Sequence, residues 1–321
     1  MGNYIRIVLS IVIIAGVSTR CFADDMIQKV REINHERFYR LKEITSDGSK
    51  TFVLDEGNLK VFVISENGEL ITSFGRQGKG PGEFVEPVDI VLHNDTLAVL
   101  EHSGLKVVQF DTAGTFLNEF SVKQMLPFSF NYSDGEYQVV TLTHNDGYLQ
   151  RYSVSGQLIK SNVVDGSASE PLSDKAPQQM QIFSKMNFWT NSNYDYYAGY
   201  FYKPVIEKYN SNFRNVETAT LKLDLPEPSV ELRGNAAFIR GEPIVYDIQY
   251  FNGALYALWW NRNLQQIECN GFATLSKYSA DLILEEKSVL PDCLLGFHIN
   301  NGFLYGICNE PVPKVVIYAL E

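Results

Sequence analysis

The sequence predicts an all-β fold, a six-bladed β-propeller of four-stranded antiparallel blades that closes by pairing its N- and C-terminal strands. Three observations support this prediction: an internal repeat, six apolar runs that each close on a large apolar side chain, and Gly-containing turns between short apolar runs. A length of 321 residues alone would suggest about two ordinary domains. An internal repeat takes precedence over that estimate, because each repeat is one unit of a larger array.

The repeat is clearest between residues 52–75, FVLDEGNLKVFVISENGELITSFG, and residues 98–121, AVLEHSGLKVVQFDTAGTFLNEFS. The two segments align without a gap at an offset of 46 residues, so that Asp55 falls on Glu101. Each copy has short apolar runs separated by polar turns, and its second turn carries a glycine. This pattern is typical of strands in an antiparallel meander.

Weaker copies of the same pattern continue to the end of the chain. Each copy offers one apolar run as the third strand of a blade, and these runs close on Ile64, Phe110, Tyr152, Tyr209, Tyr278 and Tyr318. Six units of about 50 residues fall within the range of propeller blades. The runs are apolar at consecutive positions, which indicates strands that are covered on both faces.

The two ends of the chain are expected to meet. The last unit stops after its third strand and would leave an unpaired edge. Residues 36–44, ERFYRLKEI, precede the first full repeat and are strand-like, so we expect them to pair with the C-terminal strand. An amphipathic helix over residues 26–37 is the alternative for the N-terminal part. Two turn-rich stretches, residues 161–179 and 225–240, are expected to be excursions from the blades.

Residues 1–23 are typical of a signal peptide. Arg6 supplies a positive start, an apolar run follows it, and Cys21 and Ala23 place small residues three and one before a cut. The run is shorter than the ~20 apolar residues that a membrane-spanning helix needs. We therefore expect a periplasmic or secreted protein, with residues 24–321 as one propeller domain.

The net charge of the chain limits the classes of partner that it can bind. The sequence holds 27 basic and 38 acidic residues, and removal of the leader takes away two arginines and no acid. Such an acidic chain disfavours nucleic acids and anionic membranes. A protein, peptide or glycan partner remains, and no later segment is apolar enough to span a membrane. We expect a monomer.

The cysteines allow alternatives at two places. A lipid anchor on Cys21 is the alternative to simple cleavage, although Arg20 stands where such sites prefer a small residue. After cleavage, Cys269, Cys293 and Cys308 remain. An oxidising compartment would permit a Cys293–Cys308 disulfide, because both residues lie in the last repeat. Three buried, reduced cysteines are the alternative.

Residues 75–120, GRQGKGPGEFVEPVDIVLHNDTLAVLEHSGLKVVQFDTAGTFLNEF, contain Gly-Pro-Gly-Glu-Phe, a proline, an apolar strand, an acidic turn residue and a closing Asp-x-x-Gly. This stretch resembles an NHL repeat, and the similarity extends over residues 54–120. The whole chain is similar to exported six-bladed propeller proteins of Bacteroidetes envelopes. The resemblance implies a propeller fold and no single activity, because the fold serves binding proteins and enzymes alike.

The Gly-rich stretch is expected to connect an outer strand that ends at Phe74 to the innermost strand of the next blade near Val88. Four glycines and a proline within residues 75–82 supply the tight turns of this crossing. Phe84 is expected to fill the space between two blades, and Glu83 to accept hydrogen bonds from backbone amides. A phosphate-binding loop is the alternative, but it requires Ser or Thr after Gly-Lys and a following helix. Here a glycine follows the lysine, and a strand follows the loop.

Polar residues gather at one end of the predicted ring. In a four-stranded meander, the crossing between blades shares a face with the turn between the second and third strands. This face would carry the candidate ligand-binding residues Asp55, Glu56, Arg76, Lys79, Glu83, Glu101, His102, His144, Asn145 and Asp146. The alternative for Asp55 and Glu101 is turn capping in equivalent blades, and the alternative for the two histidines is a solvated turn.

Aromatic residues are abundant, with 18 Tyr, 20 Phe and 3 Trp, and most are expected to pack between blades. Trp259 and Trp260 are adjacent, so in a strand they point to opposite faces. Trp260 is a candidate platform on which a sugar or a peptide could stack.

Two functions fit these features. The favoured one is a non-enzymatic binding or scaffold propeller, because the chain has an export signal, a regular repeat, and neither a Gly-x-Ser-x-Gly nor a His-Glu-x-x-His motif. This function predicts no cofactor. The alternative is a metal-dependent hydrolase or lyase of the lactonase or amidating-lyase type, with a divalent cation at the channel mouth. The residues that could bind such a cation are Glu56, Glu101, His144 and Asp247.

Overall fold

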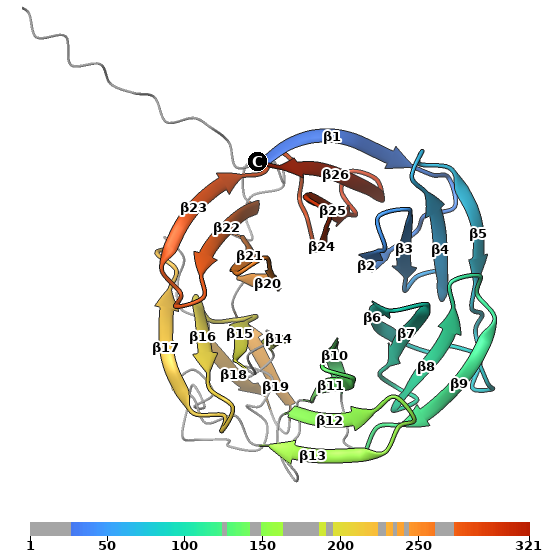
Figure 1. The fold of residues 1–321 in the computed structure, drawn as a ribbon, viewed down its shortest axis with the longest axis horizontal. Coiled ribbons are helices and arrows are strands. Elements are labelled where there is room, and N and C mark those ends of the chain that lie inside the picture. The colour runs from blue at the N-terminus through green and yellow to red at the C-terminus, as the bar shows by residue number, and fades with distance from the viewer. Residues whose placement is uncertain are drawn as a thin grey trace, which may run out of the picture.

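The computed structural model describes residues 27–123, 127–141, 149–162, 186–190, 195–223, 229–233, 236–240, 244–260 and 273–321. Within these ranges every regular element is a β-strand, and no segment forms a helix that could cross a membrane. Figure 1 shows the four-stranded sheets around a central axis, with strands such as β2, β6, β10, β20 and β24 nearest the axis.

Six four-stranded antiparallel sheets form the ring, which confirms the predicted fold class. Blade 1 consists of β2 (Leu41–Ser46), β3 (Lys50–Asp55), β4 (Lys60–Ser65) and β5 (Leu70–Phe74). Blade 2 consists of β6 (Pro87–His93), β7 (Thr96–Glu101), β8 (Lys106–Asp111) and β9 (Phe116–Ser121). Blade 3 consists of β10 (Pro127–Ser133), β11 (Glu136–Thr141), β12 (Leu149–Ser153) and β13 (Leu158–Asn162). Blade 4 consists of β14 (Met186–Thr190), β15 (Tyr196–Tyr200), β16 (Val205–Tyr209) and β17 (Asn215–Thr220). Blade 5 consists of β20 (Val245–Phe251), β21 (Ala254–Trp260), β22 (Ala273–Ser279) and β23 (Leu284–Val289). Blade 6 consists of β24 (Gly296–Asn300), β25 (Phe303–Cys308), β26 (Lys314–Leu320) and β1 (Ile27–Asn34).

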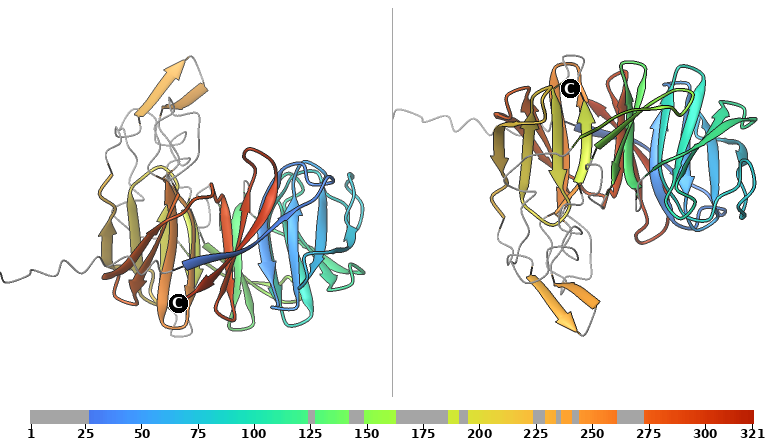
Figure 2. Two further views of the ribbon diagram at one scale, coloured as in Figure 1. Left: turned by 90° about the horizontal axis from the view of Figure 1, so that it is seen from above. Right: turned by 90° about the horizontal axis from the view of Figure 1, so that it is seen from below.

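The repeat located the third strand of every blade correctly. The six predicted closing residues all lie in third strands, which are β4, β8, β12, β16, β22 and β26. A seventh, two-stranded sheet of β18 (Ser229–Arg233) and β19 (Ala236–Arg240) falls within the expected excursion at residues 225–240. This hairpin stands away from the ring in both views of Figure 2.

The prediction for the closing strand was wrong. Residues 36–44 do not pair with the C-terminal strand, because residues 41–46 form β2, the innermost strand of blade 1. The strand that pairs with β26 is β1, from Ile27 to Asn34, so the alternative helix over residues 26–37 is also wrong. Residues 41–46 are needed as the inner strand of the first blade. The outer edge of the last blade is covered instead by β1, the segment that precedes these residues in the chain (Figure 1).

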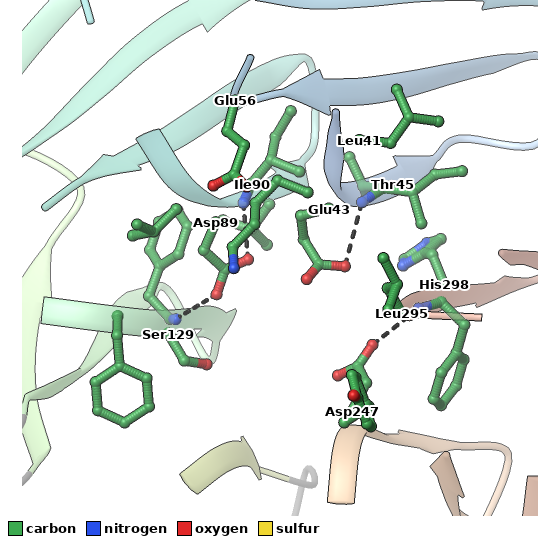
Figure 3. Close-up of a pocket in the computed structure, with 18 of the residues that line it drawn as sticks. Leu41, Glu43, Thr45, Glu56, Asp89, Ile90, Ser129, Asp247, Leu295 and His298 are labelled. Carbon is green, nitrogen blue, oxygen red and sulfur yellow. Dashed lines mark hydrogen bonds between the residues drawn. The ribbon is translucent and has the colours of Figure 1, made fainter. Parts of the chain in front are cut away.

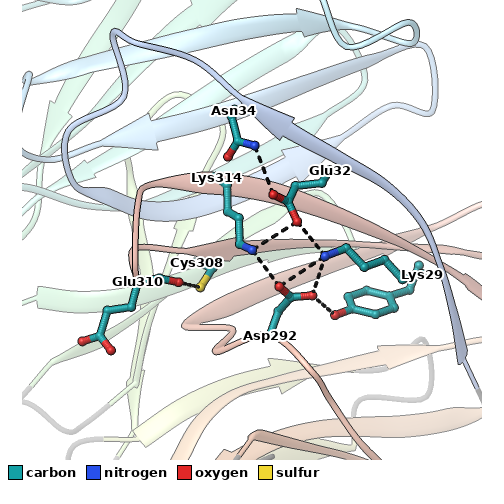
Figure 4. A network of polar contacts seen from close by, with 8 residues as sticks. Lys29, Glu32, Asn34, Asp292, Cys308, Glu310 and Lys314 are labelled. Carbon is teal, nitrogen blue, oxygen red and sulfur yellow. Dashed lines mark hydrogen bonds and ion pairs between the residues drawn. The ribbon is translucent and has the colours of Figure 1, made fainter. Parts of the chain in front are cut away.

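A polar network holds the closing strand in place (Figure 4). Lys314 Nζ of β26 lies 2.8 Å from Asp292 Oδ1 and 3.1 Å from Glu32 Oε2 of β1. Lys29 of β1 pairs with the same two carboxylates, and the Tyr318 hydroxyl donates to Asp292 Oδ2 at 2.6 Å. Burial opposes ionisation of Asp292, but the hydrogen bonds from Lys314, Tyr318 and Lys29 hold the pKa of its carboxyl below the usual range.

The core is divided among the six interfaces between neighbouring blades. Phe52 and Leu54 of β3 pack in the cluster between blades 1 and 2, whereas Val53 packs between blades 6 and 1. Consecutive positions of one strand therefore enter different clusters, which is why the strands are apolar on both faces. Trp259 and Trp260 follow the same rule, since they lie in the clusters on opposite sides of blade 5.

The Gly-rich crossing has the predicted structural role. Phe84 is fully buried in the cluster between blades 1 and 2, and Glu83 Oε2 accepts a hydrogen bond from the Gly80 amide at 2.8 Å. Gly75 has a φ of 88°, and a Cβ there would lie 2.5 Å from the Phe84 ring. Glycine is therefore required at this position for both its backbone angle and its small size.

The structure does not contain the Cys293–Cys308 disulfide that an oxidising compartment would permit. Cys293 and Cys308 are not joined by a disulfide bond, and both are buried in the cluster between blades 5 and 6. The Cys308 thiol donates instead to the Glu310 carbonyl at 3.0 Å, and burial raises the pKa of this thiol. Cys269 lies outside the described residues.

Candidate functional site

A cavity of about 340 Å³ lies in the central channel (Figure 3). The innermost strands β2, β6, β10, β20 and β24 supply most of its walls, and Phe201, which follows β15 in blade 4, completes them. Side chains from all six blades therefore meet in one space. Its lining combines aromatic and aliphatic side chains with a large share of polar and charged ones. Concave sites in which polar groups converge are where small molecules usually bind.

A shared irregularity of the inner strands aims polar side chains into this cavity. In four blades the pairing of the first and second strands shifts by one residue near the start of the inner strand. Such bulges re-aim side chains. The residues that follow the shift are Glu43, Asp89, Ser129 and Asp247, and all four line the cavity.

Backbone amides fix two of these carboxylates. Asp89 Oδ1 accepts from the Ile90 amide and Asp89 Oδ2 from the Phe130 amide in the next blade, both at 2.7 Å. Asp247 repeats this arrangement. Its Oδ1 accepts a hydrogen bond from the Ile248 amide at 2.8 Å, and its Oδ2 accepts one from the Phe297 amide in blade 6 at 2.9 Å. These two acids are therefore both cavity walls and links between blades.

Glu43 is held less completely. Its Oε1 accepts one hydrogen bond, from the Ile44 amide at 3.2 Å. The carboxylate packs against Gly296 of blade 6, where a Cβ would stand 2.7 Å from Oε1. Its second oxygen, Oε2, accepts no hydrogen bond from the part of the chain that the structure describes, and Figure 3 shows the group pointing toward the middle of the cavity.

The three acids resist ionisation. Burial raises the pKa of Asp89 to about 7 against the opposing effect of its amide hydrogen bonds. Burial, and then the charge of Asp89, raises the pKa of Asp247 to about 8. Burial and the charges of Asp247 and Asp89 raise the pKa of Glu43 well above its usual value. At neutral pH the cavity therefore holds a mixture of protonated and ionised carboxyl groups.

Two basic side chains complete the titratable lining near these acids. Lys42 lies close enough to lower the pKa of both Glu43 and Asp89. Burial lowers the pKa of His298 to about 4, so its imidazole is neutral at physiological pH. Arg40, the other permanent base of the lining, is ion-paired with Glu56.

The structure gives Asp55 and Glu101 the capping role that was the alternative to ligand binding. Both are fully buried at the ends of second strands. Asp55 accepts hydrogen bonds from the amides of Tyr39, Arg40, Gly57 and Asn58. Glu101 accepts from the amides of Val85 and Glu86 at 2.5 and 2.7 Å. Each acid ties the segment that enters its blade to a turn of the same blade, and neither lines the cavity.

The candidates of the Gly-rich crossing lie away from the channel cavity. Arg76 Nη2 pairs with Glu83 Oε1 at 2.7 Å, and Lys79 is exposed on the same loop. His102 donates its backbone amide to the Glu86 carbonyl, which confirms that the crossing and the second turn share a face. His102 Nδ1 lies 2.7 Å from the Pro127 carbonyl oxygen at the start of blade 3.

The remaining candidates divide between cavity and core. Glu56 lines the cavity and pairs with Arg40 at 2.8 Å, and Asp247 lies in the same space. Trp260 is 5% exposed, and its Nε1 donates to the Leu294 carbonyl at 2.8 Å. Its ring stacks on Tyr246, which lines the cavity, so Trp260 lies behind the wall rather than on it. His144, Asn145 and Asp146 lie outside the described residues.

Sequence reasoning missed Glu43, Asp89 and Ser129. The signal was present for the first two, because they are separated by the same 46-residue offset that aligns Asp55 with Glu101. Ser129 occupies the equivalent position in blade 3 but is not acidic, and it lies in a weaker copy of the repeat. Across the described residues, no three His, Cys, Asp or Glu side chains are arranged to hold a metal ion.

These features define a six-bladed β-propeller with a polar cavity in its channel. The chain belongs to the DUF5128 family, described as a 6-bladed beta-propeller, whose family model matches residues 35–229. A search of curated proteins found no match. The narrower resemblance to NHL repeats stays a prediction.

Solved structures share the fold at low sequence identity. A Bacteroides fragilis protein described as exported is 13% identical with a TM-score of 0.56, and the alignment covers 93% of this chain and 96% of that chain. A member of the DUF4221 family from Bacteroides vulgatus is 8% identical with a TM-score of 0.60, over 92% and 97% of the two chains. Virginiamycin B lyase from Staphylococcus aureus is 13% identical with a TM-score of 0.55, over 91% and 99%. At these identities the likeness concerns the fold alone.

Proposed function

We propose that this protein is a non-enzymatic binding propeller of the cell envelope that holds a small ligand in its channel cavity. The observation that carries the proposal is the cavity of about 340 Å³, which is lined by side chains from all six blades. A closed ring of blades makes such a space rigid, because each wall is also one face of a packed core. Rigid, largely pre-formed cavities are typical of ligand-binding sites.

The polar groups of the cavity support recognition rather than chemistry. Both oxygens of Asp89 and of Asp247 already accept hydrogen bonds from backbone amides. These bonds fix the direction in which each carboxylate faces a ligand. Aromatic rings of Phe128, Phe201, Tyr246 and Phe297 complete the walls and offer flat surfaces for packing.

Export forms part of the same proposal. Residues 1–23, outside the described part of the chain, have the features of a signal peptide, and a structural neighbour is described as exported. The acidic composition supports a neutral or cationic ligand, or a peptide, over a nucleic acid. A periplasmic or secreted binding module is the function that these observations favour together.

Tryptophan fluorescence tests the proposal, because Tyr246 of the cavity wall stacks on Trp260 with ring centroids 4.5 Å apart. Purified protein is titrated with sugars, short peptides, amines and carboxylic acids. We expect a saturable change with at least one class. Leu295→Phe, which fills the cavity, should abolish this change, whereas Ile71→Phe on outer strand β5 should keep it. The absence of a saturable change with every class would contradict the proposal.

Metal analysis of the purified protein tests the enzymatic alternative. The alternative requires a divalent cation at the channel mouth, and Glu56 and Asp247 are the described members of its expected ligand set that line the cavity. A stoichiometric divalent ion that disappears in Asp247→Asn would favour a metal-dependent lyase or hydrolase over a binding module.

A further inference from the structure

The channel cavity carries an unbalanced charge. Its lining contains four acids and two permanent bases, which are Glu43, Glu56, Asp89, Asp247, Arg40 and Lys42. The Arg40–Glu56 ion pair neutralises one acid and one base. Lys42 forms no ion pair with the described residues, although it lies near two of the three acids that remain. The cavity is therefore short of two positive charges when all of its carboxyl groups are ionised.

The missing charge does not fit a single metal ion. The three acids come from blades 1, 2 and 5, and no three ligands among the described residues meet at one point. A metal ion needs its oxygen ligands within about 2.6 Å. A longer molecule with a cationic group at each end can contact acids on separate blades, and its length can occupy the space between them.

Glu43 differs from the other two acids in the number of hydrogen bonds that it accepts. Its side chain lines the cavity and is half-buried, and its Oε2 receives no hydrogen bond from the described residues. Asp89 and Asp247, at the equivalent bulges, each have both oxygens satisfied by backbone amides. An acceptor that the protein leaves open beside two satisfied equivalents is available to a donor group from water or from a ligand. The aromatic walls favour an organic cation as this donor, because aromatic faces attract ammonium groups and pack against methylene chains.

We propose that the channel cavity binds a linear aliphatic diamine or polyamine, with one ammonium group on Glu43 Oε2 and another on Asp89 or Asp247, the acids of blades 2 and 5. This inference rests on the proposed binding function and specifies its ligand class. Two ammonium groups match the two missing positive charges. The net charge of −11 on the whole chain attracts such ligands over a distance and raises their rate of encounter.

Isothermal titration calorimetry with 1,4-diaminobutane and spermidine tests this proposal, with 1,4-butanediol as the neutral control of equal length. We expect 1:1 binding of both amines and no binding of the diol. Glu43→Gln and Asp247→Asn should each weaken amine binding at least tenfold. Glu217→Gln on exposed outer strand β17 should leave it unchanged.

The pH dependence provides a second readout that a purely structural role would not produce. Ammonium groups favour the ionised form of the acids, so binding should release protons. The affinity should rise between pH 6 and pH 8.5, where the acids lose their protons and the amines, with pKa values near 10, keep theirs. Titrations in two buffers of different ionisation enthalpy measure the protons released.

Several results would overturn the inference. They are equal affinity for the diamine and the diol, unchanged amine binding in a folded Glu43→Gln or Asp247→Asn protein, or stoichiometric Ca²⁺ or Mg²⁺ binding that these substitutions abolish. Circular dichroism establishes that each variant is folded, and either variant suffices for the comparison. If amines fail but another ligand class gives the saturable fluorescence change described above, the binding function stands and only the ligand class is wrong.

Discussion

Asp89 Oδ2 in blade 2 accepts a hydrogen bond from the backbone amide of Phe130 in blade 3, at 2.7 Å. Asp247 and Phe297 repeat this contact between blades 5 and 6. The acids that line the channel are thus also part of what holds the ring together. Changes in their protonation should consequently affect stability as well as ligand binding.

Asp247→Asn should alter the pH dependence of stability. The folded protein raises the pKa of Asp247 to about 8, whereas an unfolded chain leaves an aspartate near 3.9. Between these values the folded state binds the extra proton, so this residue's contribution to stability falls as the pH rises through that window. The melting temperature of the variant relative to wild type should therefore increase from pH 5 to pH 8.5. Parallel melting profiles would contradict the raised pKa.

Phe84→Ala should destabilise the protein by about 3–5 kcal/mol, because it opens a cavity in the fully buried cluster between blades 1 and 2. The neighbouring Val85→Ala is the matched control, because the Val85 side chain is 39% exposed. This substitution should lower the free energy of unfolding by about 0.5 kcal/mol or less. Urea unfolding of both variants measures the difference. Equal losses would show that the crossing does not depend on the Phe84 ring.

Asp292→Ala should cost about 3 kcal/mol, because it leaves Lys314 without its closest partner in a mostly buried network. Glu286→Ala, which breaks an exposed pair with Lys277, should cost about 1 kcal/mol or less. The pKa of Asp292 is lowered in the folded protein, so its contribution is present above about pH 4 and is lost as the pH falls through the lowered value. The gap between Asp292→Ala and wild type should therefore narrow below pH 4, and a constant gap would argue against an ionic role.

Deletion of residues 27–34 should remove the outer strand of blade 6 and expose the edge of β26. Exposed edges pair with other chains, so size-exclusion chromatography with light scattering should show dimers or larger species in place of the expected monomer. A synthetic peptide of residues 27–34 should restore the monomer by covering the same edge. A deletion protein that stays monomeric and as stable as the full chain would show that the ring closes without this strand.

Much of the fold was predictable because the repeat encodes it locally. Short apolar runs that close on a large apolar side chain recur in each unit, and these located all six third strands. The closing strand was misassigned because β1 has few buried side chains, with Ile27 and Ile33 as its buried apolar residues. Its pairing depends on the edge of β26, which is distant in sequence and not visible in the local pattern of residues 27–34.

The candidate site was less predictable than the fold. Asp55 and Glu101 were conspicuous in the repeat, yet they accept hydrogen bonds from backbone amides of the segments that enter their blades. Arg76 and Glu83 pair with each other on the crossing, away from the cavity. A recurring polar residue is as often needed to satisfy backbone amides as to contact a ligand, and sequence spacing does not separate these two roles.

The sequence by itself determined the number of blades, the antiparallel order of their strands and the crossing between blades, because these depend on contacts between nearby residues. Only the tertiary structure decided which acids share the channel. Glu43, Asp89 and Asp247 lie in blades 1, 2 and 5, and a closed ring brings their carboxylates into one buried space. Their raised pKa values and unbalanced charge arise from that shared burial, which no single repeat contains.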